Sequence, residues 1–249
     1  MIFFASDVHL ASGTPAAEAI TARFLSFLER ARREASAVYL LGDIFEYWVG
    51  DEELKRRKYQ PVFSALRELT QAGVAVYFMA GNRDFLLSDQ TLAQLGIHRL
   101  PDPYVLSLPN WQFVLSHGDL YCTDDVAYQR YRATVHDPKI QAKFLGYPYW
   151  VRRLIARWLR WRSEGRRTDA QTLEMTDVSE ATVEDEARRH GYATMIHGHT
   201  HRPATHDIIV DGIHVERWVL ADWSPERGEY LAWDERATAE DGRLTRHTI

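Results

Sequence analysis

Short apolar runs that each end abruptly in polar residues constrain this chain more than any other feature of its sequence. Residues 2–5, 38–41, 74–80, 113–116 and 193–196 have the pattern of buried strands. The polar residues that follow them are Asp7-Val8-His9, Gly42-Asp43, Gly81-Asn82-Arg83-Asp84, His117-Gly118-Asp119 and His197-Gly198-His199-Thr200-His201. Because sites in open α/β sheets form where loops leave the carboxyl ends of strands, we expect these segments to converge.

Helical patterns over residues 16–35 and 59–72 separate the first three predicted strands. This alternation of strand and helix predicts a layered α/β fold. Beyond residue 203 the pattern changes, and residues 207–210, 213–220 and 229–233 are predicted to be short antiparallel strands. The turns between them are expected at Asp211-Gly212 and Arg227-Gly228.

Residues 124–191 interrupt the strand series and are predicted to be helical. Apolar residues recur there at helical spacing among many arginines: Tyr147, Val151, Leu154, Trp158 and Trp161. A second helix is expected over residues 175–189. We therefore predict a helical cap at 124–191, inserted into a core made of residues 1–123 and 192–249.

Composition narrows the classes of protein to which the chain can belong. The formal net charge is −5 at pH 7, whereas proteins that act mainly on nucleic acid are usually basic, so no nucleic-acid partner is expected. No signal peptide is recognisable, and no apolar run approaches the roughly 20 residues that a spanning helix needs. The single cysteine, Cys122, is expected to be a small packed residue. A cytoplasmic protein is predicted.

The polar segments offer oxygen and imidazole donors without a thiolate: Asp7, His9, Asp43, Asn82, His117, His199 and His201. Such donors suit Mn²⁺, Zn²⁺ or Fe²⁺. They exceed the needs of one tetrahedral ion and suit two ions about 3.5–4 Å apart that share a carboxylate. Asp43 is the expected bridge, because it stands alone on its loop. The remaining histidines are not expected to be ligands: His98, His136, His190, His206 and His214.

The order of these motifs resembles the calcineurin-like metallophosphoesterase superfamily over residues 1–203. The resemblance implies a four-layer α/β/β/α sandwich with a dinuclear centre, in which His199 and His201 match ligands and His197 does not. Arg83 stands where the superfamily usually has histidine. That departure resembles one branch, the UDP-2,3-diacylglucosamine diphosphatases of lipid A biosynthesis. The longer matching segments are residues 41–51, 81–87, 117–125, 128–138 and 197–203.

The resemblance to this branch implies hydrolysis of UDP-2,3-diacylglucosamine to UMP and 2,3-diacylglucosamine 1-phosphate, with two divalent ions, for which Mn²⁺ is expected. It implies substrate contacts by Asn82, Arg83, Asp125, Ser163, Arg167 and His199. It also implies catalysis by Asp43, Asn82 and Arg83 with a metal-bound water. The cap position at which the family usually has lysine falls at Ala170 or Gln171 here.

The expected partners are the UDP-linked diacylated glucosamine lipid and the cytoplasmic face of the inner membrane, to which the protein would attach peripherally. No protein partner is required. Two alternatives remain: another metallophosphoesterase, such as a nuclease or a phosphatase, or a noncatalytic scaffold of the same fold. Net charge and Arg83 argue against the first, and the presence of all seven donors argues against the second.

Overall fold

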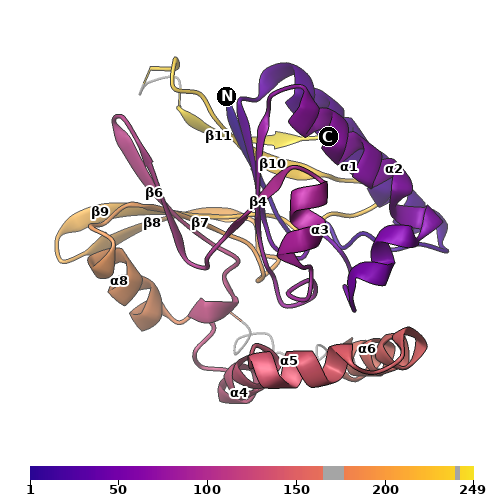
Figure 1. Cartoon of the computed structure of the whole chain (residues 1–249). Helices are drawn as coiled ribbons and strands as arrows, with labels where there is room; N and C mark the ends of the chain where they lie inside the picture. The colour runs from indigo at the N-terminus through magenta and orange to yellow at the C-terminus, as the bar shows by residue number, and fades with distance from the viewer. Residues whose placement is uncertain (165–176, 239–241) are drawn as a thin grey trace.

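The computed structural model describes residues 1–164, 177–238 and 242–249, and its strands form two sheets (Figure 1). The first sheet has six strands in the order β11-β10-β1-β2-β3-β4. The strands β1 to β4 are parallel, and β10 and β11 run antiparallel to their neighbours. Their bounds are β1 Ile2–Ala5, β2 Ala37–Leu41, β3 Ala75–Met79, β4 Ile97–Leu100, β10 Glu229–Trp233 and β11 Leu244–Thr248.

The second sheet has five strands in the order β5-β6-β7-β9-β8. Their bounds are β5 Tyr104–Leu108, β6 Trp111–Ser116, β7 Thr194–His197, β8 Ala204–Val210 and β9 Ile213–Val219. The predicted hairpin of β8 and β9 is confirmed, and its turn residues Asp211 and Gly212 both have positive φ, 53° and 82°. In contrast, β10 lies in the first sheet, so the turn at Arg227-Gly228 leads from one sheet to the other.

Helices cover the sheets and one end of the strands. Their bounds are α1 Pro15–Glu34, α2 Gln60–Gln71, α3 Asp89–Gln94, α4 Val126–Val135, α5 Pro138–Leu145, α6 Tyr149–Glu164 and α8 Glu180–Arg189, and the 3-10 turns are η1 Asp51–Lys55, η2 Arg57–Tyr59 and η3 Asp119–Tyr121. The start of α1 follows from its sequence. The Thr14 side chain accepts a hydrogen bond from the Ala17 N–H at 3.2 Å, and Pro15 occupies the first turn.

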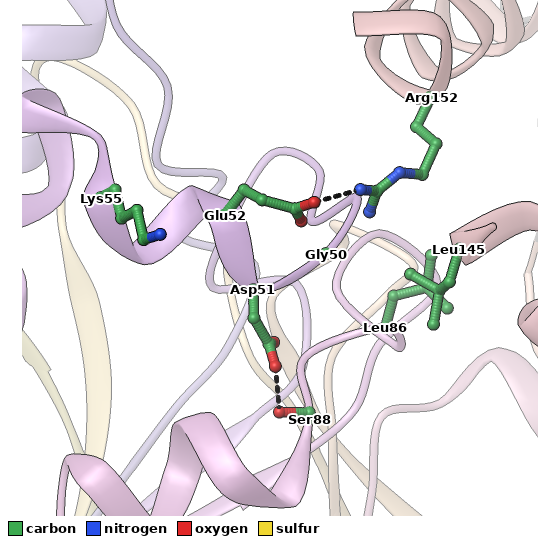
Figure 2. Close-up of a pocket in the computed structure, with 8 residues that line it drawn as sticks. All are labelled: Gly50, Asp51, Glu52, Lys55, Leu86, Ser88, Leu145 and Arg152. Atoms are coloured by element: carbon green, nitrogen blue, oxygen red, sulfur yellow. Dashed lines mark hydrogen bonds and ion pairs between the residues drawn. The ribbon is translucent and has the colours of Figure 1, made fainter. Parts of the chain in front are cut away.

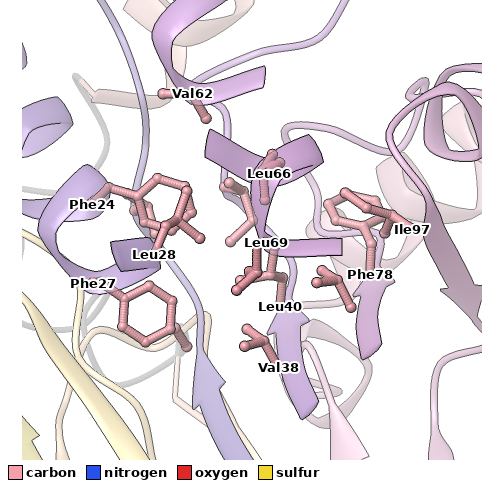
Figure 3. Packing of buried hydrophobic residues seen from close by; sticks show 14 of the residues in the cluster. Phe24, Phe27, Leu28, Val38, Leu40, Val62, Leu66, Leu69, Phe78 and Ile97 are labelled. Carbon is pink, nitrogen blue, oxygen red and sulfur yellow. The ribbon is translucent and has the colours of Figure 1, made fainter. Parts of the chain in front are cut away.

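Alternation of side chains along the central strands divides the core into three layers. Phe3 packs in the layer between the first sheet and helices α1 and α2, part of which is shown in Figure 3. The next residue, Phe4, lies between the two sheets, 5.7 Å from the ring of Phe113. Val114 of β6 faces the other way and packs with Val183 of α8. This arrangement is the predicted α/β/β/α sandwich.

Several elements differ from the sequence-based predictions. The helix expected over residues 175–189 begins at Glu180, and it packs on the second sheet as the fourth layer of the sandwich. The short helix α3 and the strands β4, β5 and β11 were not predicted. All three of these strands are sheet edges, where a continuous apolar run is not required. Cys122 is buried, as predicted.

Helices α4, α5 and α6 lie together on the side of the sandwich away from the N-terminus (Figure 1). Arg152 of α6 is 4% exposed and binds Glu52 and the Val49 carbonyl of the core. Figure 2 shows this junction, where Leu145 of α5 lies beside Leu86 at a cavity of about 400 Å³. In the part of the chain that the structure describes, none of the helices combines the length and the apolar character needed to cross a membrane.

Candidate metal centre

The predicted donors lie just beyond strand ends, and most of them hold the backbone in the left-handed region. The φ angles are 52° for Asp7 and His9, 54° for Asp43, 68° for His199 and 56° for His201. Non-glycine residues adopt such angles at a cost of about 1–3 kcal/mol each, and these residues cluster at functional sites. Hydrogen bonds between loops hold these turns in place. The His9 N–H, for example, donates to the Asp43 carbonyl at 2.9 Å.

One group of donors consists of Asp7, His9 and His201, whose ligand atoms lie within 4.8 Å of one another. The Asp7 Oδ1 is 3.3 Å from the His201 Nε2, and the two histidine Nε2 atoms are 3.2 Å apart. Asp7 is fully buried. The donors of the first and last motifs, which are separated by 192 residues along the chain, are therefore brought together.

A second group consists of Asp7, Asp43 and His117, again within 4.8 Å. The Asn82 Oδ1 joins it, at 3.1 Å from the His117 Nε2 and 3.1 Å from the His199 Nδ1. All seven predicted donors thus lie in one cluster, in which Asp7, Asp43 and His117 are buried and the other four are partly exposed. The carboxylate common to both groups is that of Asp7, and the bridging role of Asp43 stays a prediction.

An unsatisfied carboxylate oxygen in this cluster fits a bound cation. Within the described part of the chain, the Asp7 Oδ1 is buried and has no hydrogen-bond partner. Buried polar atoms normally have a partner, so such an atom indicates a ligand that completes the site. The donors are carboxylate, amide and imidazole without thiolate, which suits a divalent transition metal. The residues therefore fit divalent metal ions.

Burial shapes the protonation of these side chains. Desolvation lowers the pKa of His199 to about 3 and that of His9 well below its usual value, so both rings are neutral and carry a lone pair. Burial raises the pKa of Asp43 to about 7, with a contribution from the charge of Asp84. Burial also raises the pKa of Asp7, but the close approach of the His201 ring and the charges of nearby histidines outweigh it and lower this pKa overall.

Glycine is required beside two of the carboxylates because no side chain fits there. A Cβ atom on Gly81 would lie 2.2 Å from the Asp43 Oδ1. A Cβ atom on Gly198 would lie 2.2 Å from the Asp7 Oδ2. The backbone approaches each carboxylate so closely that only glycine can occupy these positions.

Asp84 shapes the site without belonging to the donor set, and the sequence predicts no role for it. Its buried carboxylate accepts hydrogen bonds from the N–H groups of Asp43, Ile44, Phe45 and Gly81, at 2.8 to 3.3 Å. It therefore fixes the loops that carry Asp43 and Asn82 relative to each other. Its place in the Gly-Asn-Arg-Asp motif was visible in the sequence, but its partners are backbone groups that leave no sequence pattern.

The predicted substrate contacts are only partly described. Arg83 is close to the donors, since its Nε lies 3.8 Å from the Asp43 Oδ2. The half-buried Asp125 caps α4, and its Oδ1 accepts from the Tyr128 N–H at 2.8 Å. The side chain of Ser163, and Arg167 with the rest of residues 165–176, lie outside the described residues.

Histidines outside the donor set make other contacts. The His197 Nδ1 lies 2.9 Å from the Gly198 carbonyl, and its Nε2 accepts from Arg217 at 3.0 Å. Burial lowers the pKa of His197 to about 4, so this ring is a neutral structural group. The other histidines predicted not to be ligands belong to neither donor group among the described residues: His98, His136, His190, His206 and His214.

Comparisons with known proteins show the family to which the chain belongs. The family model of the calcineurin-like phosphoesterases matches residues 1–203. A UDP-2,3-diacylglucosamine hydrolase of Aromatoleum aromaticum is 43% identical over 232 residues, 93% of this chain and 92% of that protein. A protein of the same name from Chromohalobacter salexigens is 45% identical over 231 residues, 93% of this chain and 90% of that protein. A dimetal phosphatase structure from Danio rerio is 17% identical with a TM-score of 0.48, covering 100% of this chain and 98% of that one. The matched residues contain all seven converging donors, and the chain belongs to the calcineurin-like phosphoesterase family.

Proposed function

We propose that the protein hydrolyses the diphosphate of UDP-2,3-diacylglucosamine to UMP and 2,3-diacylglucosamine 1-phosphate, a step of lipid A biosynthesis. The observation that carries the proposal is the convergence of the seven donors in one cluster. The substrate follows from relatives of that name, which are 43% and 45% identical over 93% of the chain.

The proposed ligands of one ion are Asp7, His9, Asp43 and His201, and those of the other are Asp43, Asn82, His117 and His199. We propose Mn²⁺ because imidazole nitrogen and carboxylate oxygen are mixed in both sets. Two such ions, when bound, act as Lewis acids that activate water and offset the charge of phosphoryl oxygens.

The remaining chemistry belongs to the chain itself. In the proposed reaction the oxygen of water attacks the α-phosphorus, and the bond from that phosphorus to the bridging oxygen breaks. Negative charge grows on the α-phosphoryl oxygens. Arg83, at 3.8 Å from the Asp43 carboxylate, can donate to these oxygens in a bidentate way, and the neighbouring Asn82 lies 3.1 Å from His199. Fixed donors aimed at this charge lower the barrier.

The cap is proposed to cover the lipid part of the substrate. Helix α6 exposes Trp150 by 66% and Leu154 by 54%, four residues apart on one face. Exposed arginines such as Arg157 can meet anionic headgroups. We propose that the part of residues 124–191 that precedes α8 forms this cap, because α8 packs on the second sheet, and that Asp125, Ser163 and Arg167 position the substrate. The protein would then attach peripherally to the cytoplasmic face of the inner membrane.

Mass spectrometry of products formed in ¹⁸O-labelled water tests the proposal. The protein, stripped of metal and reloaded with Mn²⁺, is incubated with UDP-2,3-diacylglucosamine, and a parallel sample stays metal-free. We expect UMP that carries one ¹⁸O atom, and no product without metal. Label in the lipid 1-phosphate would contradict attack at the α-phosphorus. Turnover of DNA or a phosphopeptide, but not of this lipid, would identify a nuclease or a phosphatase instead. No turnover by protein with full metal content would favour the scaffold.

A further inference from the structure

Glu46 is a buried carboxylate that lies between His9 of the donor cluster and the neighbouring Arg83. It lies on the loop after β2, and its N–H donates to the Leu10 carbonyl at 3.1 Å. Leu10 and Phe45 form an isolated parallel bridge, so this loop and the one after β1 run side by side. The residue is 6% exposed. A buried carboxylate is unfavourable without partners, and the two oxygens of Glu46 face different ones.

One oxygen of Glu46 holds Arg83. Its Oε1 accepts a hydrogen bond from the Arg83 Nη1 at 2.7 Å, and the two side chains are only 8% and 15% exposed. The pair is therefore largely shielded from water, where a charge-assisted hydrogen bond is strong. The Arg83 N–H meanwhile donates to the Asp43 Oδ1 at 2.8 Å. Arg83 is thus held both by its backbone N–H and by its guanidinium.

The other oxygen stands behind the ring of His9. The Glu46 Oε2 lies 3.8 Å from the His9 Nδ1, which is buried and has no hydrogen-bond partner among the described residues. The opposite ring nitrogen, Nε2, faces Asp7 and His201. If Nε2 is to offer its lone pair to a cation, the proton of the neutral ring must sit on Nδ1 and needs an acceptor there. A shift of about 1 Å would bring Oε2 into hydrogen-bond range.

We infer that Glu46 is a positioning residue whose single carboxylate orients both His9 and Arg83, and so couples metal binding to phosphate binding. The role of Arg83 in this inference rests on the proposed function, whereas the role of His9 rests on the candidate metal centre alone. Loss of the Glu46 charge should therefore weaken both metal binding through His9 and phosphate binding through Arg83.

The chain offers a control for the His9 contact of Glu46, at a residue that does not form the ion pair with Arg83. Asp222 stands behind His201, with its Oδ2 at 3.6 Å from the His201 Nδ1, in the same relation that Glu46 has to His9. It is not part of the Glu46–Arg83 pair. A control for the loss of a buried ion pair is Glu229, which binds Arg246 and has a side chain 5% exposed.

The test compares Glu46→Gln, Asp222→Asn and Glu229→Gln in two assays. Mn²⁺ affinity is measured on metal-stripped protein by competition with a chelating fluorophore, without substrate. KM and kcat for UDP-2,3-diacylglucosamine, and for bis(p-nitrophenyl) phosphate, are measured at saturating Mn²⁺. We expect Glu46→Gln to weaken Mn²⁺ binding by about 10- to 100-fold and also to raise KM at saturating metal. Asp222→Asn should weaken Mn²⁺ binding without raising KM, and Glu229→Gln should change neither.

Mn²⁺ affinity of Glu46→Gln within about twofold of the parent would overturn the inference, because second-shell loss normally costs more. If Glu46→Gln weakened Mn²⁺ binding without raising KM, as expected for Asp222→Asn, the coupling would be overturned. If Glu46→Gln does not fold, Glu46→Asp keeps the charge one methylene further back, and an unchanged Mn²⁺ affinity in it would count against the inference. If the parent protein bound Mn²⁺ but did not hydrolyse the lipid, only the proposed function would be contradicted, since the affinity assay needs no substrate.

Discussion

The candidate metal centre and the cap helices are built in opposite ways. Asp7 and Asp43 are buried, and the loops that carry them are tied to each other by backbone hydrogen bonds. Helices α4 and α5, by contrast, have no buried residue among those described, and α6 exposes Trp150 by 66%. Chemistry at phosphorus requires a fixed geometry, whereas a cover for acyl chains must keep apolar surface available. The difference fits the proposed division of these tasks between the two regions.

The cap is nevertheless fixed at both of its ends by polar side chains. On the η1 side, the Tyr149 hydroxyl donates to the Glu53 Oε1 at 2.7 Å. On the η3 side, the Asp119 Oδ2 accepts from the Tyr128 hydroxyl at 2.9 Å and from the Arg132 Nε at 2.8 Å. Changes in the cap should therefore alter substrate binding, and changes in the metal centre should alter turnover.

The largest effect is expected for Asp43→Ala, which tests the candidate metal centre, the rigid region of the two. The variant removes a carboxylate oxygen from the donor group of Asp7 and His117, so kcat should fall by at least about a thousandfold. The fold should persist, because the loop retains its hydrogen bonds to Asp84. Steady-state hydrolysis with circular dichroism checks both. Turnover within about tenfold of the parent would contradict the metal mechanism.

The next largest effect is expected for Asp84→Ala, which tests whether the loops of the candidate metal centre depend on one buried carboxylate. The substitution leaves four backbone N–H groups without their partner, at about 1–3 kcal/mol each when buried. Partial relaxation should reduce the total loss of unfolding free energy to about 3–5 kcal/mol. Urea denaturation measures it. The control is Asp89→Ala, whose side chain is 82% exposed and should cost within about 1 kcal/mol. Equal losses in the two variants would contradict the role of Asp84.

The same contrast explains which parts of the molecule the sequence predicted. The core strands and the seven donors were predicted, because buried strands need apolar runs and a metal site needs particular donor types. Edge strands such as β4 were missed, since its middle residues His98 and Arg99 are exposed and break the apolar pattern. The placement of β10 in the first sheet was also missed, because the periodicity of a strand does not show which sheet it joins.

Supporting residues of the site were harder to predict than the donors. Asp84 binds backbone groups, Glu46 binds a side chain 37 residues away, and Asp222 reaches His201 only through the fold. An aspartate or glutamate is common in any loop, so residue type alone does not identify these roles. Their function depends on distances that only the tertiary structure supplies.

A smaller effect is expected for Arg152→Met, which loosens the cap without touching the metal centre. The side chain is 4% exposed and ties α6 to Glu52 and to the Val49 carbonyl. We expect hydrogen exchange in α5 and α6 to accelerate, and KM for the lipid to rise about tenfold, equivalent to about 1.4 kcal/mol. The kcat should stay within about twofold. Lys143→Met, which changes an exposed cation on the neighbouring helix α5, is the control. A fall in kcat with unchanged KM would show that the two regions are not separable.

The smallest effect on the protein itself is expected for Trp150→Ser, which tests whether the exposed face of α6 serves a surface outside the molecule. Trp150 is 66% exposed, so its loss should change the free energy of unfolding by no more than about 0.5 kcal/mol. A tryptophan that enters a bilayer interface buries an apolar area worth about 2 kcal/mol, so binding to anionic vesicles should weaken by about tenfold or more. Ile209→Ser on β8 is the matched control, because Ile209 is also 66% exposed but lies on the second sheet. Vesicle sedimentation and thermal unfolding give the two readouts. Equal vesicle binding by both variants would place the membrane contact elsewhere and leave α6 as a cover for the substrate alone.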